Sequence, residues 1–67
     1  MLLKVNGVEI NSYDVVQVSR NGHAWEDYAT IRTHDDANCA ASLVLNGRDG
    51  LGSRYRVVRA GKIILQA

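Results

Sequence analysis

The chain has 67 residues, of which 46% are hydrophobic and 22% are charged, and it contains no proline. This composition predicts one small globular domain spanning residues 1–67 and excludes a disordered chain. No apolar run is long enough to span a membrane, and the N-terminal residues lack the apolar region of a signal peptide. The only cysteine, Cys39, excludes an internal disulfide and favours a reducing, cytoplasmic location.

Charge is distributed unevenly along the chain, although its formal net value is only +1. Residues 1–47 carry three basic and six acidic side chains, whereas residues 48–67 carry five basic and one acidic side chain. The two parts could pair inside the fold, or they could form surfaces that attract partners of opposite charge. A core this small would also gain from a homodimer, but the sequence leaves the oligomeric state open.

The first half of the chain predicts strands that are joined by tight turns. Residues 2–10 place an Asn-Gly pair between short apolar segments, which is typical of a β-hairpin, although one bent strand also fits. Residues 13–19 are rich in β-branched side chains and predict a strand. After a turn, residues 23–32 predict the returning strand, in which Asp27 breaks the alternation at an edge or a bulge.

Residues 33–47 predict the helix around which the fold is organised. Thr33 and Asp36 have the spacing of a capping box, and Gly47 is the residue type that ends a helix in a left-handed conformation. The side chains at helical spacing along one side are small, which lets the helix lie close against a sheet. This stripe consists of Ala37, Ala40, Ala41, Val44 and, at its margin, Leu45.

The rest of the chain predicts an exposed glycine-rich connector at 48–53 and two strands at 54–59 and 62–66. The apolar run in the last strand predicts burial on both sides or a covered edge. The expected fold class is α+β, with one helix packed on a small antiparallel sheet as ββαββ plus an extra N-terminal hairpin. The second sheet face should be polar and open. The candidate core is Trp25, Ile31, Val44, Tyr55, Val57 and Ile64.

No pattern of residues predicts catalysis, a cofactor or a metal site. His23, His34 and Cys39 lack the paired spacing of a zinc site, and Cys39 is better explained as a half-buried thiol. Helix capping accounts for the adjacent carboxylates at 35–36. The glycine-rich stretch at 46–52 follows a helix and precedes a strand, which is the wrong order for a phosphate-binding loop. We therefore expect a protein that is not an enzyme.

The basic strand at 54–59 is the strongest candidate for a binding surface. Strand alternation places Arg54 and Arg56 on one face, beside tyrosine side chains. Arginine and tyrosine are enriched at protein interfaces, where arginine can hold carboxylates across the contact. The candidate contact residues are Arg48, Arg54, Tyr55, Arg56, Arg59 and Tyr28.

Two other interpretations of the same side chains stay open. The arginines could grip the phosphates of a nucleic acid while the tyrosines stack on its bases. Alternatively, the arginines could cover apolar surface and pair with Asp14, Glu26 or Asp27 of the same chain.

Three segments, Tyr28–Ile31, Thr33–Ala41 and Tyr55–Gly61, follow a layout found in very small phage-encoded proteins. In this layout the chain resembles anti-CRISPR inhibitors with a ββαββ arrangement. The resemblance implies a non-enzymatic inhibitor that binds a host protein or ribonucleoprotein complex in the host cytoplasm. Some such inhibitors imitate DNA with an acidic surface, whereas this chain has a positive net charge. We therefore expect a protein-binding module, with a small nucleic-acid-binding protein that uses the basic strand as the alternative.

Overall fold

A computed structural model describes residues 1–47 and 52–67 of the chain. The elements are β1 (Leu3–Val5), β2 (Val8–Ile10), β3 (Val15–Ser19), β4 (Glu26–Thr30), α1 (His34–Asn46), β5 (Arg54–Arg59) and β6 (Lys62–Gln66). β1 and β2 form a two-stranded sheet, and the other strands form an antiparallel sheet in the order β4-β3-β5-β6. Over the described residues, the expected α+β fold with an extra N-terminal hairpin is confirmed.

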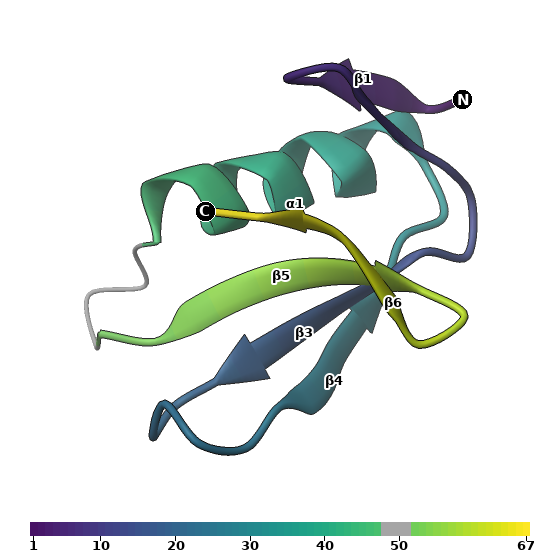
Figure 1. The fold of residues 1–67 in the computed structure, drawn as a ribbon. Helices are drawn as coiled ribbons and strands as arrows, with labels where there is room; N and C mark the ends of the chain where they lie inside the picture. Colours follow the sequence, from purple (N-terminus) through teal and green to yellow (C-terminus); the bar gives the residue numbers. More distant parts are fainter. Residues whose placement is uncertain (48–51) are drawn as a thin grey trace.

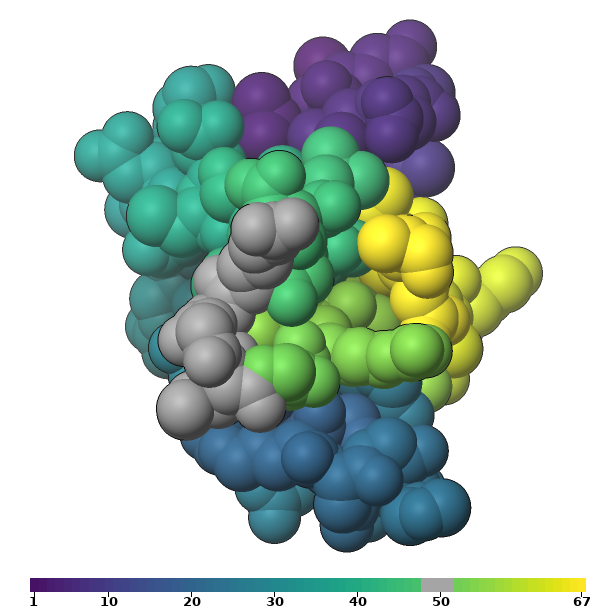
Figure 2. Space-filling view, turned by 90° about the vertical axis from the view of Figure 1, so that its left-hand side faces the viewer, coloured from purple at the N-terminus to yellow at the C-terminus, as the bar shows by residue number. Residues whose placement is uncertain are grey.

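The helix lies along one face of the four-stranded sheet (Figure 1). The β1–β2 hairpin lies next to the N-terminal half of the helix, on the side that faces away from the sheet (Figure 1). Seen from the end where the helix stops, these parts form three tiers, with the hairpin in purple, the helix in green and β3–β4 in blue (Figure 2). The core sits between helix and sheet, and side chains of the hairpin pack against it. The hairpin and the helix therefore stand on the same side of the sheet.

The helix begins and ends as its sequence predicts. The Thr33 hydroxyl accepts a hydrogen bond from the Asp36 N–H, while the Asp36 carboxylate accepts one from the Thr33 N–H, each at 3.1 Å. At the other end Gly47 has a φ of 59°, and its N–H donates to the Leu43 carbonyl. The predicted small-residue stripe is buried except at Leu45, which is 45% exposed because it lies beyond the contact with the sheet.

Two turns have the backbone geometry that tight hairpins require. Asn6 and Gly7 have φ values of 50° and 81°, and Ala60 and Gly61 have values of 51° and 79°. Two successive residues with positive φ form a type I′ turn, whose twist matches that of paired strands. The first turn shows that residues 2–10 form a hairpin and not one bent strand.

Two strands begin later than the sequence predicts. β3 begins at Val15 because Tyr13 has a φ of 69°, which is incompatible with a strand. β4 begins at Glu26 because the Asn21 side chain accepts hydrogen bonds from the N–H groups of residues 23 and 24 and folds them into a loop.

The two edge strands each carry an irregularity. Val16 is opposite Ala29 while Gln17 is opposite Asp27, which leaves Tyr28 as an extra residue in β4. Ile64 is the corresponding extra residue in β6. A bulge, one of the two explanations offered for the broken alternation at Asp27, is therefore confirmed. Since a one-residue shift reverses the direction of a side chain, the bulge turns Asp27 to the same face as Gln17.

Strand register divides the sheet into two faces. Val16, Val18, Tyr55, Val57 and Leu65 point to the helix and belong to the core, and we call this the inner face. The alternate residues point the other way, to what we call the outer face. They are Val15, Gln17 and Ser19 of β3, Asp27 and Thr30 of β4, Arg54, Arg56 and Val58 of β5, and Ile63 and Gln66 of β6.

The predicted core is partly correct. Ile31, Val44, Tyr55 and Val57 are buried. Trp25 was wrongly assigned to the core: it is half-buried and stacks against Arg56, an outer-face residue. Ile64 is only partly buried at the rim of the core. The expectation that the last strand is buried on both sides is also wrong, because the helix covers one face only and leaves Ile63 45% exposed.

The capping box yields a stability prediction. Thr33→Ala removes the acceptor for the Asp36 N–H, and we expect it to lower the free energy of unfolding by about 1 kcal/mol. Urea denaturation followed by circular dichroism measures this change. The matched control is Ser42→Ala at an exposed position of the same helix, which should change stability by less than about 0.5 kcal/mol. Equal effects of the two substitutions would contradict the role of the cap.

Candidate interaction surface

The outer face carries an ordered chain of polar side chains centred on Arg56. The guanidinium carbon of Arg56 lies 4.1 Å from the centroid of the Trp25 ring, a cation–π contact. Its Nε donates a 2.8 Å hydrogen bond to Gln17 Oε1, and Gln17 Nε2 donates a 3.1 Å hydrogen bond to Asp27 Oδ1. Three strands or their ends thus contribute to one connected array.

Arg54 lies beside this array. It is opposite Ser19 in the register and two residues before Arg56, so both arginines point to the outer face as predicted. Arg54 is exposed, and it has no hydrogen-bond or ion-pair partner within residues 1–47 and 52–67.

The opposite half of the outer face is apolar. Val15 is opposite Val58, and Val58 is opposite Ile63, so the three side chains form a strip across β3, β5 and β6. Val58 is buried within this strip, while Ile63 is 45% exposed at its end. The outer face is therefore mixed in character, whereas the sequence predicted a polar face.

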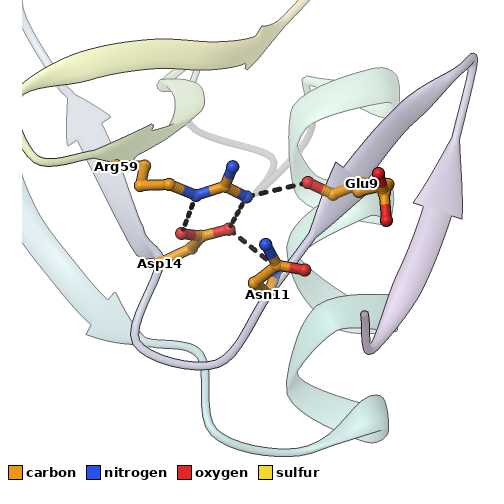
Figure 3. A network of polar contacts seen from close by, with 4 residues as sticks. All are labelled: Glu9, Asn11, Asp14 and Arg59. Carbon is orange, nitrogen blue, oxygen red and sulfur yellow. Dashed lines mark hydrogen bonds and ion pairs between the residues drawn. The ribbon is translucent and has the colours of Figure 1, made fainter.

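Arg59 was a predicted contact residue, and the structure places it in a network within the molecule (Figure 3). Its Nε and one Nη bind the two carboxylate oxygens of Asp14, each at 2.8 Å, and the same Nη donates to the Glu9 carbonyl. Asp14 also accepts a hydrogen bond from the Asn11 N–H. The pairing with Asp14, one of the alternatives raised by the sequence, is confirmed.

This network ties together segments that are far apart in the sequence. Asp14 is 1% exposed, and burial by itself raises the pKa of its carboxyl. The hydrogen bonds from Arg59 and Asn11 and the charge of Arg59 outweigh burial, so the pKa of Asp14 lies below its usual value of 3.8. The ion pair therefore joins β5 to the segment before β3 and to the N-terminal hairpin.

The other predicted contact residues lie elsewhere. Tyr55 is 5% exposed on the inner face, so its side chain belongs to the core. Tyr28 is 51% exposed and meets the ring of Tyr55 edge-on at 5.5 Å, which places it on the helix side of the sheet. The aromatic neighbour of Arg56 is thus Trp25, and not either tyrosine. Arg48 lies outside the described residues.

Sequence reasoning missed Gln17 and the role of Trp25, and it named Asp27 only as a possible ion-pair partner of the arginines. The signal for Gln17 was its position between two valines that both face the core, which predicts an outward side chain. Asp27 and Trp25 could not be placed from alternation alone, because the bulge and the loop before β4 change the register.

The described residues contain no other arrangement that suggests chemistry. No group of three His, Cys, Asp or Glu side chains within them could hold a metal ion. No helix in this part of the chain has the length and apolar character to cross a bilayer. Cys39 is exposed, whereas the sequence predicted a half-buried thiol, because it lies outside the alanine stripe.

Comparison with known proteins gives no relative from which a role could be transferred. No family model, curated protein or solved structure matches the chain.

The ion pair predicts how stability depends on pH. Asp14→Asn should lower the free energy of unfolding at pH 7 by about 2–3 kcal/mol, somewhat less than for a fully buried pair because Arg59 is 42% exposed. Because the pKa of Asp14 is lowered on folding, its stabilising effect is complete above pH 3.8 and is lost as pH falls further. Urea denaturation from pH 7 to pH 2 should show the two proteins converging below pH 3.8.

A surface ion pair provides the control. Arg20 and Glu26 are 3.5 Å apart with side chains 61% and 74% exposed, so Glu26→Gln should cost less than about 1 kcal/mol. A constant difference between wild type and Asp14→Asn down to pH 2 would show that the ion pair is not the source of the effect.

Proposed function

We propose that this protein is a non-enzymatic protein-binding module that contacts its partner through the outer face of the sheet. The observation that carries the proposal is the array in which Arg56 is held between Trp25 and Gln17, next to an exposed Arg54 and an exposed Ile63. Tryptophan and arginine are the side chains that most often dominate binding energy at interfaces, and they act best beside apolar surface.

The size of the molecule supports a contact made by one whole face. Its accessible surface is 4423 Å², and a standard interface buries about 800 Å² on each partner. An interface of that size is about a fifth of this surface, which is comparable to one side of a small sheet. The inner face is occupied by the helix, so the outer face is the broad surface that the sheet can offer.

Nucleic-acid binding, the second function predicted from the sequence, has less support. A base needs a free aromatic ring on which to stack, whereas Arg56 already occupies one face of Trp25. The resemblance to phage-encoded inhibitors makes a nucleic-acid-handling complex of a CRISPR system the first partner to assay.

The double variant Arg54→Ala/Arg56→Ala tests the proposal. Both side chains lie outside the core, so the variant should keep the circular dichroism spectrum of the wild type. It should lose the partner that the wild-type protein captures from host lysate, as measured by quantitative mass spectrometry, with at least a tenfold drop expected for two anchors of about 1 kcal/mol each.

The matched control removes the same charge elsewhere. Arg20→Ala/Arg32→Ala deletes two exposed arginines outside the outer face and should leave capture unchanged. Equal loss of capture in both double variants would indicate a nonspecific charge effect. Unchanged capture by Arg54→Ala/Arg56→Ala would refute the assigned surface.

A further inference from the structure

We infer that the partner presents an acidic protein segment, and that one of its side-chain carboxylates binds the guanidinium of Arg56 while Arg54 binds a second one. This inference rests on the proposed function of the outer face and adds the chemistry of the partner.

Arg56 is fixed before any partner arrives. The ring of Trp25 supports the flat side of the guanidinium at 4.1 Å, and Gln17 accepts from Nε at 2.8 Å. Gln17 is itself oriented by its hydrogen bond to Asp27. A free arginine side chain loses considerable rotational freedom on binding, but this one has already lost much of it on folding. The array therefore positions a cation for recognition.

The free donors of Arg56 match a carboxylate. Within residues 1–47 and 52–67, no hydrogen bond or ion pair involves either Nη atom of Arg56. These two nitrogens form a planar edge whose N–H groups can bind both oxygens of one carboxylate. Lysine cannot make the same pair of bonds, because its ammonium is a single point charge.

Arg54 adds a second cation at a defined interval. It lies two residues away on the same strand face, which corresponds to about 6.6 Å along the strand. An extended partner segment repeats its side chains on one face at the same interval. Glutamate or aspartate at alternate positions of such a segment would therefore meet both arginines.

The surroundings favour a protein over a nucleic acid. The apolar strip of Val15, Val58 and Ile63 continues the outer face beyond the arginines, and Ile63 remains 45% exposed. A polyanionic backbone gains nothing from this strip, whereas an acidic peptide can place apolar residues on it. Charge and apolar surface together select a segment that contains both side-chain types.

Trp25 allows the inference to be tested directly, because it is the only tryptophan in the chain and lies against Arg56. The blocked peptide Glu-Ala-Glu-Ala-Glu is titrated into the full-length protein in low-salt buffer while tryptophan fluorescence is recorded. We expect a saturable change with this peptide and none with Gln-Ala-Gln-Ala-Gln. Arg56→Lys keeps the positive charge but removes the paired N–H donors that bind both oxygens of one carboxylate. It should therefore raise the dissociation constant of the glutamate peptide about tenfold.

The controls are the variant Arg20→Ala/Arg32→Ala, the glutamine peptide and an oligothymidine. Arg20→Ala/Arg32→Ala should bind the glutamate peptide as the wild type does. A wild-type protein that gives no saturable change, or that binds both peptides equally, would overturn the inference. Tighter binding of a ten-residue oligothymidine than of the glutamate peptide would overturn it in favour of nucleic acid.

The two proposals fail in different ways. If Arg54→Ala/Arg56→Ala loses its captured partner while the glutamate peptide does not bind, the outer face is the binding surface and the carboxylate inference is wrong. If that double variant captures its partner normally, the proposed function itself is wrong.

Discussion

One helix of 13 residues covers only part of one face of a four-stranded sheet, and the rest of the structure follows from this limit. Four strands spaced about 4.8 Å apart are wider than a helix of about 10 Å diameter. The helix contacts β1, β5 and β6, and all five residues of β4 remain exposed. The outer face receives no helix, so its side chains are either satisfied by one another or available to a partner.

A core this small needs a further constraint, and the Asp14–Arg59 pair supplies it. The N-terminal hairpin adds one fully buried side chain to the core, Ile10, while Leu3, Val5 and Val8 are only partly buried. The hydrogen bond from Arg59 to the Glu9 carbonyl gives this hairpin a direct polar contact with β5, in addition to its packing against the core. In the same network Arg59 is bound to Asp14 and to the Glu9 carbonyl. Its role therefore differs from that of Arg54 and Arg56, although all three arginines belong to one basic strand.

The local features of the fold could be predicted from the sequence, whereas the register of the edge strands could not. The cap at Thr33 and the hairpin turns depend on residue types a few positions apart, so the sequence shows them directly. The arginines at 54 and 56 could be placed because β5 is regular between them. Trp25 and Tyr28 were misplaced because a loop fixed by Asn21 and a one-residue bulge interrupt the alternation. Both events depend on pairing partners that are distant in the sequence.

The bulges in the edge strands have a consequence for crowded conditions. An edge strand offers its unpaired N–H and carbonyl groups to any neighbouring chain, and proteins often block such pairing with proline. This chain has no proline, but β4 and β6 each break their regular spacing with one extra residue, at Tyr28 and Ile64. A neighbouring strand therefore does not find a regular ladder along the whole of either edge. The irregular spacing of β4 and β6 therefore disfavours the addition of further strands at both edges of the sheet, which is the step by which a fibril grows.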